Sequence, residues 1–110
     1  TALIVDARGL PVRPMIFPAV YDEDGLEIYS RYKVDPERAA KDAMVSYCTT
    51  EKAAFTHRKS GAHPYFAAAL RELKGNPVIA HADVRKVLSH PENRINLKKC
   101  RVIFIVDAVR

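Results

Sequence analysis

The sequence predicts an α+β fold: a single domain with one mixed β-sheet of about five to seven strands and two or three short helices packed against it. Residues 2–9 and residues 102–108 carry this prediction, because each is a run of apolar and β-branched side chains that includes Val-Asp-Ala. Runs that are apolar on both faces are typical of central strands covered on both sides. We therefore expect the first and last strands to lie parallel in the middle of the sheet, with Asp6 and Asp107 near the same edge.

Length and composition indicate one domain that spans residues 1–110. The chain has 110 residues, of which 48% are hydrophobic, enough for one core and too few for two independent cores. No apolar run approaches the roughly 20 residues that span a bilayer, so we expect no transmembrane segment. Because the sequence starts without Met and lacks the regions of a signal peptide, we interpret it as a mature protein or an excised part of a longer precursor.

Residues 10–18 follow the first predicted strand and contain three prolines, which exclude a helix and a central strand. The apolar side chains of Met15, Ile16 and Phe17 are unsuited to a solvated loop. The segment is therefore predicted to be an extended, well-packed crossing.

A β-hairpin is predicted next, because β-forming residues flank an Asp-Gly turn at residues 22–25. Four carboxylates lie in or beside this turn: those of Asp22, Glu23, Asp24 and Glu27. They lack the length and the alternating oxygen ligands of a calcium loop, so the sequence predicts an exposed polar turn and no metal.

The first helix signal is Asp35, which precedes Pro36. An Asp at the N-cap and a Pro at the first helical position are typical of a helix start, and the helix is expected to end near residue 43. Residues 44–48 then alternate as a strand does, with Val45 and Tyr47 on one face.

Thr50 is expected to cap a second helix over residues 51–59 that closes at Gly61. Residues 64–73 fit a helix by their alanines and by the spacing of their apolar side chains. They fit one arm of a hairpin equally well, because a Lys-Gly-Asn turn and a short strand at residues 78–80 follow. Propensity alone leaves both alternatives open.

In the closing third, residues 82–89 have apolar side chains at helical spacing and predict a helix that Pro91 limits. Residues 93–99 are predicted to form a basic connection to the last strand. Ile95 and Leu97 are expected to point inward from this connection.

The positive charge belongs to the second half of the chain. Residues 1–55 carry nine acidic and seven basic side chains, whereas residues 56–110 carry four acidic and eleven basic ones. The basic residues considered as a phosphate-binding face are Arg58, Lys59, Arg71, Lys74, Arg85, Lys86, Arg94, Lys98, Lys99 and Arg101. They are scattered over several predicted elements without a nucleic-acid motif, so a solvated basic surface is predicted and nucleic acid is not expected as a partner.

The two cysteines, Cys48 and Cys100, are too few for a disulfide framework or a metal cage. Each lies in apolar sequence, which favours buried free thiols. Whether the two pair in an oxidising compartment is left open by their spacing.

An alternative function is that of a small-ligand or metal-binding domain, which could also be an enzyme. It would use Asp6, Arg8 and Asp107, because ligands of α/β sheets bind beyond the carboxyl ends of parallel strands. The structural interpretation is favoured, since Arg8 is close enough to neutralise Asp6 and an Asp at a strand end commonly caps a turn. The serines and cysteines lack a neighbouring base and the glycines are not grouped, so we expect no catalytic residue and no cofactor.

The sequence resembles a family of bacterial envelope domains that occur in small outer-membrane lipoproteins and in the N-terminal region of flagellar assembly protein T. The resemblance is carried by residues 4–10, Pro14, Pro18, the Asp24-Gly25 hairpin, Tyr29 and residues 100–107. It implies an exported precursor, a location in the periplasm or at the periplasmic face of the outer membrane, and an extended conformation for residues 64–73. It also implies a noncatalytic role in assembly or protein contacts.

The partner implied by this resemblance is an envelope protein or a second copy of the chain, and the sequence indicates no particular small molecule. The surfaces expected to make the contact are residues 10–18 and the hairpin tip. Their candidate interaction residues are Arg13, Met15, Phe17, Asp22, Glu23 and Asp24.

Overall fold

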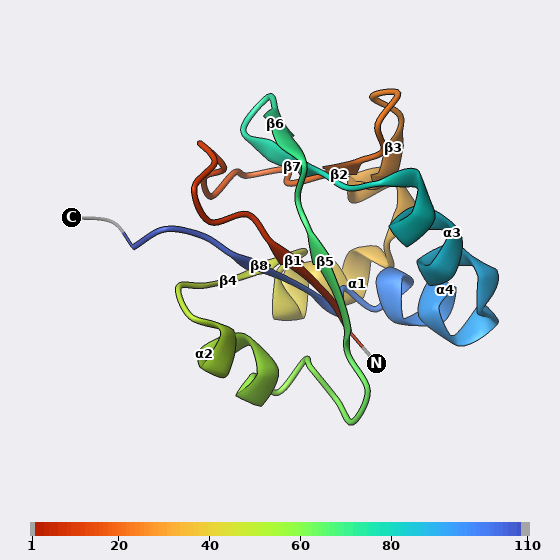
Figure 1. Ribbon diagram of the computed structural model, residues 1–110. Helices are drawn as coiled ribbons and strands as arrows, with labels where there is room; N and C mark the ends of the chain where they lie inside the picture. The colour runs from red at the N-terminus through yellow and green to blue at the C-terminus, as the bar shows by residue number, and fades with distance from the viewer. Residues whose placement is uncertain (1, 109–110) are drawn as a thin grey trace.

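The computed structural model describes residues 2–108, and a four-stranded parallel sheet lies at its centre (Figure 1). In spatial order its strands are β4 (Ser46–Cys48), β8 (Val102–Ile105), β1 (Leu3–Asp6) and β5 (Tyr65–Ala68). β1 and β8 are parallel neighbours in the middle, and Asp6 pairs with Ile105. The predicted central position of the first and last strands is confirmed.

A second four-stranded sheet lies over the first (Figure 1). Its strands in spatial order are β3 (Glu27–Tyr29), β2 (Val20–Tyr21), β7 (Asn76–Val78) and β6 (Arg71–Leu73). The β2–β3 and β6–β7 pairs are antiparallel, whereas β2 and β7 are parallel. The hairpin predicted around the Asp-Gly turn is therefore present as β2 and β3.

Short helices surround the two sheets (Figure 1). They are the 3₁₀ helix η1 (Arg31–Lys33), α1 (Pro36–Asp42), α2 (Glu51–Thr56), α3 (His81–Ser89) and α4 (Pro91–Lys98). The predicted caps are confirmed, because the Asp35 side chain accepts from the Glu37 amide and the Thr50 side chain accepts from the Ala53 amide. Within residues 2–108, no helix has the length and apolar character needed to cross a membrane.

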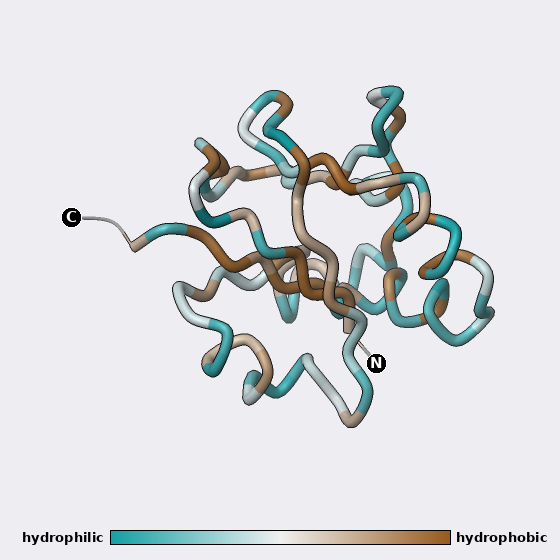
Figure 2. The backbone as a smooth tube through the Cα atoms, in the orientation of Figure 1, coloured by the Kyte–Doolittle hydropathy of each residue, from teal (hydrophilic) through white to brown (hydrophobic). Residues whose placement is uncertain are grey.

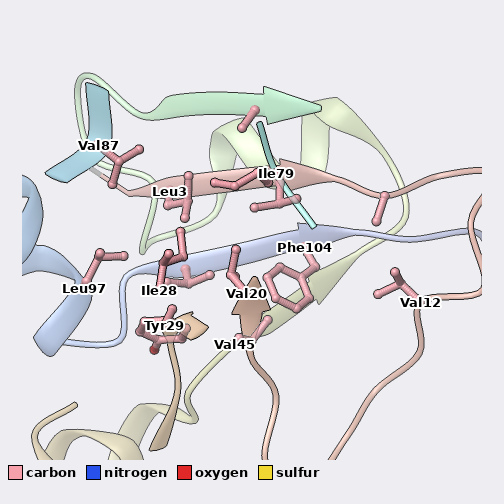
Figure 3. Packing of buried hydrophobic residues seen from close by; sticks show 14 of the residues in the cluster. Leu3, Val12, Val20, Ile28, Tyr29, Val45, Ile79, Val87, Leu97 and Phe104 are labelled. Carbon is pink, nitrogen blue, oxygen red and sulfur yellow. The ribbon is translucent and has the colours of Figure 1, made fainter. Parts of the chain in front are cut away.

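Both faces of the parallel sheet are covered, as the apolar runs predict. Val5 and Phe104 belong to the main core cluster between the two sheets, which Figure 3 shows with residues from both layers. Ile4 faces the other way and packs with Ile103 and Ala54, a residue of α2. In Figure 2 the apolar residues accordingly concentrate along the central strands.

The chain crosses from one sheet to the other between β5 and β6. The Ala69 amide donates to the Asp6 carbonyl in the first sheet at 2.9 Å, and the next amide, that of Leu70, donates to the Val78 carbonyl in the second sheet at 2.7 Å. Residues 64–73 thus take the extended conformation. The α+β class is confirmed, but eight described strands form two sheets rather than about five to seven strands in one.

The segment before the last strand differs from the prediction. Residues 93–99 belong mostly to α4, where the sequence predicted a basic connection without a helix. Pro91 limits α3 as expected, yet it also starts α4, because a proline at the first helical position lacks only an amide hydrogen that would be unpaired there anyway. Leu97 is buried as predicted, whereas Ile95 is 52% exposed.

Candidate functional site

An apolar groove opens between residues 10–18, α1 and β4, with a cavity volume of about 490 Å³. It is lined by residues 15–18, Arg31, Val34, Pro36, the alanines at 39, 40 and 43, Met44, Val45 and Tyr47. The small alanine side chains at the end of α1 leave room that larger residues would fill. Two candidate interaction residues, Met15 and Phe17, are part of this groove.

Residues 10–18 are less well packed than predicted. Val12 is buried, but Ile16 and Phe17 are 88% and 57% exposed. The expected burial of these two side chains is therefore wrong. The three prolines of residues 10–18 lack backbone donors and prevent regular strand pairing. The segment is therefore not part of a sheet that would place its side chains in the core.

Two anchors hold this segment in place. The Arg13 amide donates to the Gly75 carbonyl at 3.2 Å, and the Met15 amide donates to the Tyr47 hydroxyl at 3.4 Å. Gly75 has a φ of +81°, and a Cβ built there would lie 3.1 Å from the Met15 sulfur. A glycine is therefore needed both for the turn and for the close approach of Met15.

Two buried polar side chains hold the backbone of Ala43 and Met44, which line the groove. Lys59 is 4% exposed, and its Nζ donates to the Ala43 carbonyl at 3.2 Å. Tyr29 is fully buried, and its hydroxyl donates to the Met44 carbonyl at 2.6 Å. Burial lowers the pKa of Lys59 and raises that of Tyr29. The sequence placed Lys59 on a solvated basic surface, which is wrong.

Arg31 provides a positive charge in the groove. Its guanidinium carbon lies 4.2 Å from the centroid of the Phe17 ring and 4.7 Å from that of Tyr32, which are cation–π distances. Within residues 2–108, no carboxylate lies within 4.0 Å of this guanidinium. No signal in the sequence joined Arg31 to Phe17, because their contact depends on how η1 and the hairpin fold.

The other candidate interaction residues lie away from the groove. The Arg13 side chain lies beside Gly75 of the β6–β7 turn, 3.7 Å from the position that a Cβ would take there. Glu23 and Asp24 are exposed at the tip of the β2–β3 turn, but Asp22 is buried. Its Oδ1 accepts from the amides of Asp24 and Leu26, each at 2.9 Å, so the turn is not exposed throughout as predicted. The expected interaction surface therefore divides into two separate regions.

The alternative ligand site lies at the carboxyl ends of β1 and β8, where the sequence placed it. Arg8 donates to both oxygens of Asp6, through Nε at 2.9 Å and an Nη at 2.7 Å, and the same Nη contacts Glu51 at 2.8 Å. The Gly9 amide donates to Asp107 Oδ2 at 2.9 Å. Hydrogen bonds from the Arg8 side chain lower the pKa of Asp6, although burial opposes them. This carboxylate is therefore ionised near neutral pH and unsuited to donate a proton.

The Asp6 ion pair predicts a pH-dependent difference between wild type and Asp6→Asn. The pKa of Asp6 is lower in the folded state than its ordinary value of 3.8. The pair therefore stabilises the fold above that value and is lost as the pH falls through the folded pKa. In urea unfolding, the stability lost by Asp6→Asn should be largest near about pH 7 and shrink below about pH 4. An equal loss at both ends of this range would contradict the assignment.

The two cysteines are buried free thiols, as predicted. Burial raises the pKa of both Cys48 and Cys100, so neither is an activated nucleophile.

Fold and site define the class of the chain: a two-sheet α+β domain whose first and last strands form the centre of a parallel sheet, with an apolar groove beside the edge strand β4. Residues 2–108 match the family described as Treponema pallidum Tp0624, second domain. The chain belongs to this family. No protein with a curated description matches it.

The family match corrects the resemblance drawn from the sequence. The matching family is not that of small outer-membrane lipoproteins or of the N-terminal region of flagellar assembly protein T, so that identification is wrong. An opening Ile-Val-Asp-Ala-Arg-Gly and spaced prolines describe a central strand and a corner, which unrelated families can share. The envelope location and the lipoprotein-like character rested on that resemblance alone, and they stay predictions without support.

Proposed function

We propose that this domain is a noncatalytic protein-interaction module that holds an apolar side chain of a partner protein in the groove beside α1 and β4. The observation that carries the proposal is the exposure of Ile16 and Phe17, at 88% and 57%, on the rim of a concave apolar surface. Adjacent exposed apolar side chains beside a cavity are typical of contact sites.

Hydrogen bonds from neighbouring residues fix the shape of the groove before a partner binds. Tyr29 and Lys59 donate to the carbonyls of Met44 and Ala43, and the Tyr47 hydroxyl accepts from the Met15 amide. A preformed site loses less conformational freedom on binding than one that must be ordered by its ligand. The groove therefore favours a partner segment that fits an existing shape.

Arg31 indicates the charge of the partner. Its guanidinium stacks on Phe17 and has no carboxylate within 4.0 Å in residues 2–108. Arg31 already donates a hydrogen bond from an Nη to the Tyr32 hydroxyl, and a carboxylate beside the apolar anchor would add the ion pair that it lacks. The formal net charge of +5 also favours an acidic partner over a second copy of this chain. We therefore assign the groove to a peptide segment with an apolar residue next to Asp or Glu.

Selection from a random peptide library displayed on phage tests this function. The selected sequences are expected to share a large apolar residue adjacent to an acidic one. Phe17→Ser removes the aromatic rim, and Ala40→Arg fills the groove from the exposed face of α1; each should weaken binding of the selected peptide at least about 10-fold. Calorimetry with the synthetic peptide measures the change.

Leu26→Ser is the matched control, because Leu26 is 65% exposed and lies outside the groove. It should leave the peptide affinity unchanged. The proposal fails if no peptide is enriched, if the enriched peptides lack the acidic residue, or if Phe17→Ser and Leu26→Ser weaken binding equally. Concentration-dependent dimerisation that Ala40→Arg abolishes would replace the partner peptide with a second copy.

A further inference from the structure

The β2–β3 turn and the first turn of α3 lie side by side, although Glu23 and His81 are 58 positions apart in the sequence (Figure 1). Parallel pairing of β2 with β7 brings them together. Tyr21 pairs with Val78, and the Ile79 amide donates to the Tyr21 carbonyl at 2.9 Å. The residues that follow β2 and β7 therefore leave the sheet at the same end.

Three side chains of types that can bind a metal ion meet at this end of the sheet. Asp22 and Asp24 each offer a carboxylate oxygen and His81 a ring nitrogen, and these atoms all lie within 4.8 Å of one another. His81 Nε2 is 3.4 Å from Asp24 Oδ2 and 3.9 Å from Glu23 Oε2. Ligand atoms that share a tetrahedral zinc ion at about 2.0–2.2 Å lie about 3.3–3.6 Å apart, so small side-chain movements are enough to reach coordination.

The surrounding hydrogen bonds hold these side chains where they are. Buried Asp22 is fixed by two backbone amides at its Oδ1. Glu23 Oε2 accepts from the His81 backbone amide at 2.9 Å and so ties the turn to the start of α3. Outer contacts of this kind orient metal ligands and raise the affinity of the site.

Negative charge is in excess at this end of the sheet. The carboxylates of Asp22, Glu23 and Asp24 have no Lys or Arg within 4.0 Å in residues 2–108, and His81 is their sole ion-pair partner there. Arg71 lies close, but its Nη donates to the Glu23 backbone carbonyl and not to the carboxylate. Three negative charges face one imidazole, an arrangement that a divalent cation would neutralise.

We propose that Asp22, Asp24 and His81 bind a divalent transition-metal ion, with Glu23 as a supporting residue. The imidazole nitrogen selects Zn²⁺ and its neighbours in the first transition row over Ca²⁺ and Mg²⁺, which take oxygen ligands. Three protein ligands leave one or more positions for water or for a group of a bound partner. The sequence predicted no metal because the turn alone lacks the features of a calcium loop. The distant His81 adds an imidazole nitrogen, a ligand that the turn does not contain.

Isothermal titration calorimetry of the reduced wild-type protein with ZnCl₂ tests the site, with CaCl₂ titrated in parallel. One Zn²⁺ per chain is expected, with no saturable binding of Ca²⁺. His81→Ala and Asp24→Asn should each weaken Zn²⁺ binding by about 10- to 100-fold. The melting temperature should rise with Zn²⁺ in wild type and rise much less in both variants.

His90→Ala is the matched control, because His90 is an exposed histidine that lies between α3 and α4, outside this cluster. Its Zn²⁺ affinity should equal that of wild type. The proposal is overturned if Zn²⁺ does not saturate at one ion per chain, or if His81→Ala binds as wild type does. An equal loss in His90→Ala would show adventitious binding to surface histidines only and would overturn it as well.

Discussion

Replacing Phe104 with alanine is expected to lower the free energy of unfolding by about 3–5 kcal/mol. The ring is fully buried in central strand β8, and it contacts Tyr47 edge to face with the ring centroids 5.6 Å apart. Paired strands on both sides hold the backbone of β8, so the cavity left by the ring cannot close by local collapse. The melting temperature should fall by at least about 12 °C.

Phe55→Ala is the comparison that isolates burial. Phe55 is 43% exposed and stacks on Phe66 with the ring centroids 5.8 Å apart. Losing that pair should lower the free energy of unfolding by at most about 1.5 kcal/mol. Urea unfolding followed by far-UV circular dichroism measures both variants. Equal losses of stability would show that Phe104 does not occupy the centre of the core.

Leu97→Ala is expected to lower the free energy of unfolding by about 2–5 kcal/mol, because its side chain is 7% exposed and belongs to the main core cluster. Ile95 lies two positions earlier on the same helix, and it is 52% exposed. Ile95→Ala should change stability by no more than about 0.5 kcal/mol. The same urea experiment measures this pair.

The two substitutions distinguish a helix from the connection that the sequence predicted. On an extended segment, positions 95 and 97 would face the same way and both substitutions would destabilise the fold. On α4 they face different ways, and only Leu97→Ala should do so. A large loss in Ile95→Ala would contradict the helix and favour the predicted connection, in which Ile95 and Leu97 both point inward.

Central elements were predictable from the sequence because their signals are local and strong. Residues 102–108 are apolar at every position until Asp107, and such a run is stable only where both faces are covered. The caps at Asp35 and Thr50 were equally clear, because each side chain bonds an amide within its own first turn. These interactions are set within a few residues.

Features that depend on distant partners were missed. The division into two sheets occurs where the amides of Ala69 and Leu70 donate to different sheets, a choice that no property of those two residues encodes. The burial of Lys59 depends on the Ala43 carbonyl, which is 16 positions away. A lysine in a polar stretch is predicted to lie on the surface unless a buried hydrogen-bond acceptor for it is known.

The candidate site was half predictable for the same reason. Met15 and Phe17 stood out because apolar side chains between prolines are unusual. The opposite wall of the groove comes from α1, whose alanines are ordinary helix formers in the sequence. Phe17 precedes β2 and Arg31 follows β3, so their contact forms only when the two strands of the hairpin pair.

The parallel pairing of β1 with β8 determines how this domain would respond to tension along the chain. The β1–β8 ladder extends from the bond between the Leu3 amide and the Arg101 carbonyl to that between the Ala7 amide and the Ile105 carbonyl. β1 begins at one end of the sheet and β8 finishes at the other (Figure 1). A pull on the two ends therefore slides these strands past each other and loads their hydrogen bonds together in shear, not one after another as in unzipping. Resistance to stretching is then governed by the rate of unfolding, and the central strands supply it.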